Sequence, residues 1–317
     1  MSPRNDSAVT EFLILGFSDL PGLRVPLFLL FLLVYLFTLA GNLLIVAVIC
    51  TDSHLHTPMY FFLCNLSVLD ASSSSVSLPK LLDILATQNK SIAFSACMLQ
   101  QYFCSSLTAT EYFLLAAMAY DRYAAICDPL HYTVLMSKKL SALLAAGCWV
   151  SMFLDSAIFM VFFSKLNFCG ANQINHVFCD IAALLQLACS NTRTVELYVL
   201  VQLVLIMFGP FLLTLASYGC VVAAILKIRS AEGRRKAFST CFSQLTVVIL
   251  FYVTLFCMYM RPKSMFSAGL DKVFSLLYIA LIPMLNPMIY SLRNKDVKDA
   301  LVKLRNRCSK KCLAYAR

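Results

Sequence analysis

The sequence predicts an all-α membrane protein, a bundle of seven transmembrane helices. Of its 317 residues 60% are apolar and only 13% are charged, which leaves too little polar surface for a soluble protein of this size. Seven apolar stretches reach the roughly 20 helical residues that cross a hydrocarbon core of about 30 Å. They lack the period-two alternation of a β-barrel. The predicted spans are 25–50, 57–78, 91–120, 140–164, 197–226, 237–260 and 273–292.

The distribution of Lys and Arg predicts the topology. An odd number of spans places the two ends of the chain on opposite sides, and one side holds nine of these residues while the other holds seventeen. The more basic side is expected to be cytoplasmic. Residues 1–24 then form an extracellular N-terminus, 25–292 the bundle, and 293–317 a cytoplasmic tail with a short amphipathic helix against the membrane lipids. The net charge of +10 reflects this topology, so no nucleic-acid partner is expected.

Two acids inside the predicted spans define a candidate ion site. Asp70 lies twelve residues after Pro58, and Glu111 lies eleven residues before Arg122, so both stand roughly 17 Å from the same membrane face. Acids buried at one depth repel unless a positive charge neutralises them, which predicts a shared proton or Na⁺ ion. The alternative is that each acid is satisfied separately by Ser67 or by the two other members of the candidate site, Asn42 and Asn286.

Asp155 in the fourth span has no assigned role; a water-facing or serine-bonded side chain is expected, and a place in the pocket lining is the alternative. The four histidines lie in loops without metal-ligand spacing, and no nucleophile with a base is evident, so the sequence predicts no enzyme. Of the two sequons on the outer side, Asn5 is the expected glycosylation site, because Asn89 is too close to the bilayer.

Four of the fourteen cysteines are placed to form disulfides. Cys97 stands at the top of the third span, and Cys169, Cys179 and Cys189 lie in the long loop after the fourth. Three pairings are possible, and spacing does not choose among them. Any crosslink would turn this loop into a fixed cover over the bundle.

Several short motifs follow one another along the chain. They are TEFLILGF at 10–17, LHTPMYFFL at 55–63, LSVLD at 66–70, MAYDRYAAIC at 118–127 followed by DPLHY, SY at 217–218, KAFSTC at 236–241 and PMLNPMIYSLRN at 283–294. Together they resemble the olfactory receptors, a family of rhodopsin-like G-protein-coupled receptors, and the resemblance covers the chain from Thr10 to about Leu301 with every motif in order. The match departs from the family where Gln244 replaces a usual histidine.

This resemblance implies an odorant receptor at the plasma membrane that raises cAMP through a stimulatory, olfactory-type G protein. It implies disulfides Cys97–Cys179 and Cys169–Cys189, with Cys97–Cys189 as the alternative. Arg122, paired with Asp121 at rest, is expected to turn toward Tyr218 on activation. The residues expected at the G-protein switch are Asp121, Arg122, Tyr123, Tyr218 and Tyr290.

Helical spacing predicts where the ligand binds. Cys104, Thr108, Glu111 and Arg122 share one face of the third span, which joins a pocket to the coupling site. Since no acid stands at Cys104, the ligand is expected to be small, neutral and largely apolar. The predicted pocket contains Cys104, Ser105, Thr108, Gln202, Ile206, Tyr252, Leu255, Phe256 and Tyr259.

Overall fold

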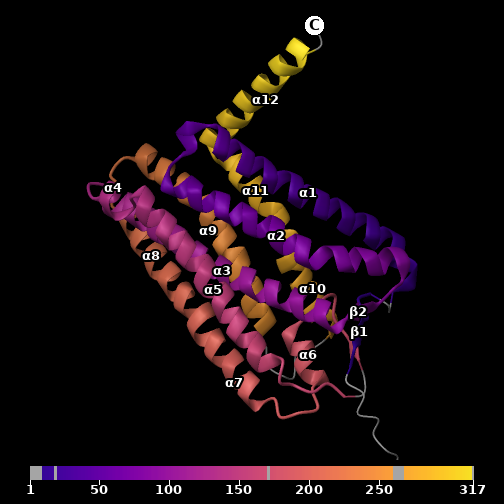
Figure 1. Ribbon diagram of the computed structural model, residues 1–317. Coiled ribbons are helices and arrows are strands. Elements are labelled where there is room, and N and C mark those ends of the chain that lie inside the picture. Colours follow the sequence, from indigo (N-terminus) through magenta and orange to yellow (C-terminus); the bar gives the residue numbers. More distant parts are fainter. Residues whose placement is uncertain (1–8, 18–19, 170–171, 260–267, 316–317) are drawn as a thin grey trace, which may run out of the picture.

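The computed structural model describes residues 9–17, 20–169, 172–259 and 268–315. The predicted glycosylation site, Asn5, lies outside these residues. Within them the chain forms long helices that lie side by side in one bundle (Figure 1). The elements are α1 (Arg24–Thr51), α2 (Pro58–Thr87), α3 (Phe94–Cys127), α4 (Tyr132–Leu135), α5 (Lys138–Phe163), α6 (Ile181–Leu187), α7 (Arg193–Gln202), α8 (Gly209–Leu226), α9 (Ala231–Tyr259), α10 (Ala268–Leu276), α11 (Ile282–Arg293) and α12 (Lys295–Tyr315).

Two of the long rods contain a π-helical segment. Residues Leu203–Phe208 join α7 to α8, and residues Leu277–Leu281 join α10 to α11. Proline follows each segment closely, at Pro210 and Pro283, where the missing N–H prevents a regular ladder. Each pair of helices therefore corresponds to one predicted span.

The predicted spans match these rods, with differences at their ends. The second helix continues past Leu78 to Thr87 with Pro79 inside it, and the third begins at Phe94 because residues Ser91–Ala93 form a strand. By length and composition five helical segments of the described residues qualify as membrane spans, and α9 holds a shorter apolar stretch, Gln244–Cys257.

Helix α3 lies at the centre of the bundle. It contacts α2, α5 and α8 along its length, and it buries polar residues such as Gln100, Gln101 and Glu111. Large apolar side chains are instead exposed on the outer helices, among them Phe37, Leu143 and Leu213. Polar residues inside and apolar residues outside are the arrangement expected in lipid.

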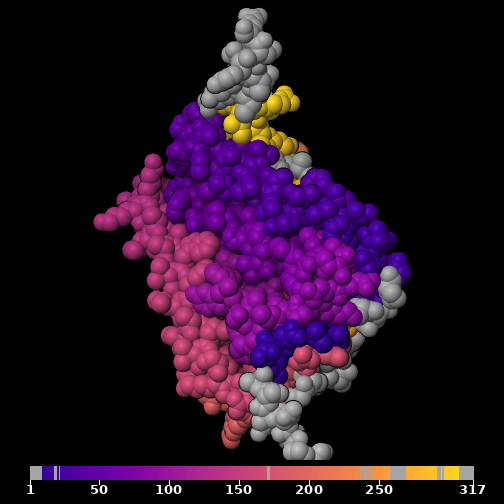
Figure 2. Space-filling model, turned by 45° about the vertical axis from the view of Figure 1, so that its right-hand side comes forward, coloured from indigo at the N-terminus to yellow at the C-terminus, as the bar shows by residue number. Residues whose placement is uncertain are grey.

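A small three-stranded sheet covers one end of the bundle, called the sheet end below. Strand β1 (Glu11–Ile14) pairs antiparallel with β2 (Ser91–Ala93) and parallel with β3 (Gln173–Ile174), in the order β2-β1-β3. Phe12 and Ile14 of β1 are fully buried. Figure 2 shows this indigo segment as a band across the lower end of the molecule. This small sheet is an addition to the predicted all-α fold, and the sequence did not indicate it because the four-residue strand is too short to show a clear alternation.

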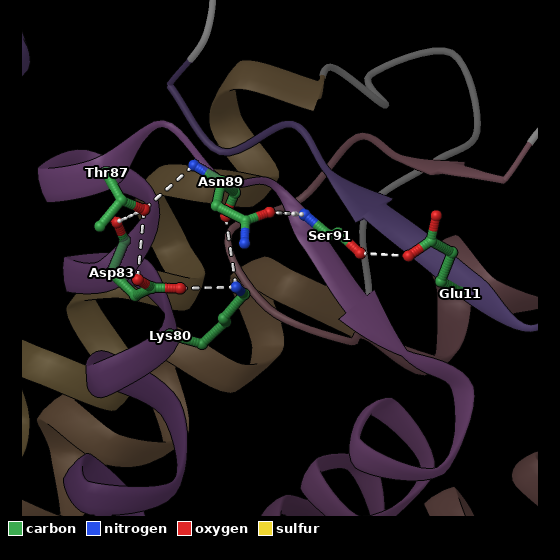
Figure 3. Close-up of polar contacts among 6 residues, drawn as sticks. All are labelled: Glu11, Lys80, Asp83, Thr87, Asn89 and Ser91. Carbon is green, nitrogen blue, oxygen red and sulfur yellow. Dashed lines mark hydrogen bonds and ion pairs between the residues drawn. The ribbon is translucent and has the colours of Figure 1, made fainter.

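A polar network fastens β2 to its neighbours (Figure 3). Lys80 pairs with Asp83 at 2.7 Å and also donates to the carbonyl oxygen of Asn89. The Asn89 side chain accepts from the Ser91 amide at 3.1 Å, and the Ser91 hydroxyl donates to Glu11 of β1. The fold thus engages both polar side chains of the Asn89 sequon.

At the opposite end, α12 leaves the bundle after a short break at Asn294 (Figure 1). Val297 and Ala300 are buried against the bundle, which makes the first turns of α12 amphipathic. Lys303 pairs with Asp52 at 3.1 Å. The His54 amide and then Lys303 lower the pKa of Asp52, so its carboxylate stays ionised and attached to α12.

Candidate functional site

A cavity of about 160 Å³ opens between α3, α5, α7 and the two π-helical segments, in the half of the bundle nearer the sheet end. Its lining combines apolar side chains with several hydroxyls, two amides and two acids. The lining residues used below are Cys104, Ser105, Thr108, Asp155, Phe178, Asp180, Gln202, Ile206, Leu255 and Tyr278.

Six of the nine predicted pocket residues line this cavity, namely Cys104, Ser105, Thr108, Gln202, Ile206 and Leu255. Tyr252 and Phe256 do not. They pack around Phe211 with ring centroids 4.9 and 5.1 Å away, in an aromatic cluster beside the cavity. The side chain of Tyr259 lies outside the described part of the chain.

Asp155 lies in this cavity wall, which corrects the expected water-facing or serine-bonded side chain. Its Oδ1 accepts from the Tyr198 hydroxyl at 2.8 Å, and its Oδ2 accepts from Gln202 Nε2 at 2.6 Å. Both donors stand one turn apart on α7, so the carboxylate bridges α5 to α7. The sequence carried the signal, an acid in an otherwise uncharged span, but gave no partner for it.

Two disulfides fix the loop that covers the cavity. The structure joins Cys97 to Cys179 and Cys169 to Cys189, which is the pairing that the resemblance implies. The Gln100 side chain accepts from the Cys179 amide at 3.0 Å, so the loop is also hydrogen-bonded to α3.

His176 makes a second connection between this loop and the bundle. The buried ring lies 3.1 Å from the Ser275 hydroxyl of α10 and edge-on to Phe178. Burial lowers the pKa of His176, and Lys272 contributes in the same direction, whereas Asp180 and the Phe178 backbone oppose it. The imidazole is therefore neutral at pH 7.

The two buried acids lie below the cavity floor. Asp70 accepts from Asn286 Nδ2 at 2.9 Å, and Glu111 lies 3.2 Å from the Tyr278 hydroxyl, which also lies 3.0 Å from Thr108 Oγ1. The second oxygen of each acid is buried and has no protein partner among the described residues. The two carboxyl groups interact electrostatically with each other.

The amide nitrogen of Asn42, a residue predicted as part of the acid site, donates to a carbonyl group of another helix. Pro287 lacks an N–H, so the Pro283 carbonyl four residues earlier has no partner in the helix, and Asn42 donates to it at 3.0 Å. In the same way Pro283 frees the Ile279 carbonyl, which accepts from Ser74 at 3.2 Å. Asn42 and Ser74 thereby donate to the two carbonyl groups that the prolines leave without a helical N–H partner.

The predicted switch residues gather at the end opposite the sheet. Arg122 pairs with Asp121 Oδ2 at 2.8 Å, and Tyr132 of α4 donates to Asp121 Oδ1 at 2.8 Å. Tyr218 and Tyr290 are buried, and neither hydroxyl has a hydrogen-bond partner within the described chain. Tyr123 stacks on its neighbour Tyr120 and does not join this network.

A helical bundle with a covered cavity near one end and a buried Arg122–Asp121 pair at the other is the arrangement typical of one class, the seven-helix membrane receptors. Comparison with known proteins gives the family. A family model described as olfactory receptor matches residues 31–307. This chain belongs to the olfactory receptor family, a family of G-protein-coupled receptors, and it is a multi-pass membrane receptor rather than an enzyme.

The relatives are similar over almost their whole length. The human protein Olfactory receptor 5B21 is 48% identical over 303 residues, which is 96% of this chain and 98% of that protein. Mouse Olfactory receptor 1M1 is 46% identical over 307 residues, 97% and 98% of the two chains. Human Olfactory receptor 5A2 is 50% identical over 304 residues, 96% and 94%.

Proposed function

We propose that this receptor binds a small, neutral, largely apolar odorant in the cavity and activates a stimulatory, olfactory-type G protein that raises cAMP. One observation carries the proposal: a single helix, α3, lines the cavity at Cys104 and Thr108 and holds Arg122 at its other end. In this proposal the chain lies in the plasma membrane with its N-terminus outside. The sheet end then faces the odorant, and Arg122 faces the cytosol.

The cavity supports a ligand of limited size. Its volume of about 160 Å³ is close to that of an engineered protein cavity of about 150 Å³ that takes up benzene. The wall formed by Phe178, Ile206 and Leu255 is apolar and suits a compact hydrocarbon skeleton. We therefore expect agonists of about benzene size that carry one polar group.

Arg122 and its neighbours support the coupling step. A guanidinium at the membrane boundary is costly unless it is paired, and Asp121 is its partner here. The nearby Tyr218 hydroxyl has no hydrogen-bond partner in the described chain, so it is available to Arg122 once the Asp121 pair opens. Outward movement of α9 would then admit the C-terminus of the G protein.

Two features support a membrane-bound cytoplasmic end. The buried face of α12 begins with Val297 and Ala300, while Lys298, Lys303 and Arg305 are exposed. A basic amphipathic helix of this kind is suited to the anionic inner leaflet.

Counting hydrogens supports a shared proton on the acid pair. The Thr108 hydroxyl donates to the Cys104 carbonyl at 2.7 Å, so its oxygen accepts from Tyr278. Tyr278 has a single hydrogen for its two acceptors, Thr108 Oγ1 and Glu111 Oε2; when that hydrogen goes to Thr108, a hydrogen on Glu111 completes the contact with Tyr278. We therefore assign the positive charge to a proton on Glu111, with a Na⁺ ion between the two free oxygens as the alternative.

The coupling proposal is tested with variants at Arg122. Arg122→Ala should abolish the agonist-driven cAMP rise at wild-type surface density, whereas Arg229→Ala, which removes an exposed guanidinium, should not. Tyr132→Phe should raise basal cAMP by up to about tenfold, because it removes one hydrogen bond that holds Asp121 at rest. A normal cAMP response from surface-expressed Arg122→Ala would contradict the mechanism.

A further inference from the structure

Asp155 has more hydrogen-bonding capacity than its protein partners use. A carboxylate offers about four lone-pair sites, and among the described residues its side-chain oxygens accept only from the Tyr198 hydroxyl and Gln202 Nε2. Neither partner carries a charge, and no Lys or Arg of the described residues forms an ion pair with Asp155. Asp155 is also one of the residues that line the cavity.

The rest of the cavity wall reinforces this polarity. Among the described residues the lining contains a second acid, Asp180, and no Lys, Arg or His. The Asp180 side chain is already engaged, because its Oδ1 accepts from the amides of Ala182 and Ala183. Thr108 also donates its hydrogen away from the cavity, to the Cys104 carbonyl. Asp155 and Asp180 are thus the two carboxylates of the wall; side chains of α7 hold both oxygens of Asp155, whereas Asp180 serves as the N-cap of α6.

We propose that Asp155 is the polar anchor of the ligand and that the receptor selects molecules with an O–H or N–H donor over acceptor-only molecules of the same skeleton. This inference rests on the proposed function and names the polar group that the neutral ligand carries, a hydroxyl. Tyr198 and Gln202 act as positioning residues, because they hold the carboxylate from α7.

The physical reason is a difference in hydrogen bonding within a largely apolar wall. A hydroxyl that donates to a carboxylate makes a charge-assisted bond, which is stronger than a bond between neutral groups. An ether or carbonyl oxygen at the same place brings lone pairs against lone pairs, and the carboxylate loses water without gaining a donor. Sites built for a substrate hydroxyl reject analogues without it strongly. We expect a preference of at least about tenfold in half-maximal concentration.

The test measures cAMP with a reporter in cells that express the receptor. The matched probes, of about benzene size, are benzyl alcohol, anisole, benzaldehyde, benzylamine and toluene. Six-carbon aliphatic molecules that carry the same polar groups form a second series. In the wild-type receptor the alcohols should act at least about tenfold more potently than the ethers and aldehydes. Asp155→Asn, similar in shape and able to donate, should reduce or reverse this ranking. Glu196→Gln, which neutralises an exposed acid of α7 outside the cavity lining, should leave the ranking unchanged.

The outcomes separate the two proposals. Equal potency of alcohol and ether, or an unchanged ranking in surface-expressed Asp155→Asn, overturns the donor rule while agonist-driven cAMP upholds the receptor function. No cAMP response to any probe by surface-expressed wild type overturns the proposed ligand class. A stronger response to benzylamine than to benzyl alcohol upholds the donor rule and replaces the neutral ligand by a cation. If Asp155→Asn fails to reach the surface, Tyr198→Phe serves instead: it removes one of the two donors that position the carboxylate, so the preference for donors should weaken, and an unchanged ranking would overturn the donor rule.

Discussion

His176 shows how one side chain makes the loop over the cavity sensitive to pH. Its ring is buried against Phe178 and lies within hydrogen-bonding distance of Ser275, and its Nδ1 has no protein partner in the described chain. Burial lowers its pKa below the ordinary value of 6.5. Protonation therefore costs more in the folded state than in the unfolded state.

Acidification should consequently loosen this loop. Below pH 6.5 the unfolded chain binds a proton at His176 that the folded chain resists, so the free energy of unfolding falls as the pH drops. His176→Gln keeps a group able to bond Ser275 and should reduce this dependence. Asp180 and Lys272, the charged groups that act on His176, remain in both proteins. Thermal unfolding of the purified receptor between pH 7.5 and 5 measures the effect, and equal pH dependence in the two proteins would refute it.

Residue-level prediction from sequence failed where a partner came from elsewhere in the fold. Asp155 stood out as an acid in an apolar span, but its donors Tyr198 and Gln202 lie on a different helix and gave no local signal. Tyr132 was visible in the DPLHY motif, yet its bond to Asp121 depends on the fold of the loop. Spacing along one helix did identify Cys104, Thr108 and Arg122, because those residues share a face irrespective of what packs against it.

Among the helices, α1 packs closely against α11 because position 41 is a glycine, which has no Cβ. A Cβ built on Gly41 would lie 3.0 Å from Pro287 Cγ and 3.2 Å from Pro287 Cβ. The same helix pair holds the Asn42 bond to the carbonyl that Pro287 leaves free. Gly41 therefore permits the close contact through which Asn42 reaches α11.

Substitution of Gly41 should expose this requirement. Gly41→Ala is expected to destabilise the receptor by about 1–3 kcal/mol, because a stiff proline ring gives way poorly to a new methyl group. Gly147→Ala on α5 is the matched control, since nothing lies within 4 Å of its added Cβ and alanine favours a helix by up to about 1 kcal/mol. Thermal unfolding in detergent compares the two. Equal effects would show that the Gly41 contact adapts without cost.

Element boundaries were predictable where hydropathy alone sets them. The first and fourth spans match α1 and α5 closely, because lipid faces much of each helix. The second span was nine residues too short at Leu78, since α2 continues through Pro79 into the polar sheet end. The strand at Glu11–Ile14 was missed because its partners, β2 and β3, come from distant parts of the chain.

For the whole molecule, α3 connects the cavity to the end of the bundle that holds Arg122. The cavity residue Thr108 contacts Tyr278, Tyr278 contacts Glu111, and Glu111 interacts electrostatically with Asp70, which accepts from Asn286 on α11. This chain of contacts ends on the helix that carries Tyr290. A ligand that displaces Tyr278 would therefore change the acid pair and the packing of α11 together.

A proton and a Na⁺ ion at the acid pair, Asp70 and Glu111, predict different effects of sodium on the receptor. With a proton on Glu111, Glu111→Gln retains a donor toward Tyr278 and should keep near-wild-type thermal stability, while Glu111→Leu, which has no donor, should be destabilised by about 1–3 kcal/mol because the Tyr278 contact is lost. Unfolding temperatures of the wild type should agree in NaCl and in choline chloride of equal ionic strength.

A bound Na⁺ ion would instead stabilise the wild type in NaCl by mass action and lower its activity as sodium rises. That stabilisation, if lost in Asp70→Asn, would overturn the proton assignment. If neither Glu111→Gln nor Asp70→Asn changes stability or its sodium dependence, and Glu111→Leu is equally stable, the two acids are independent structural groups.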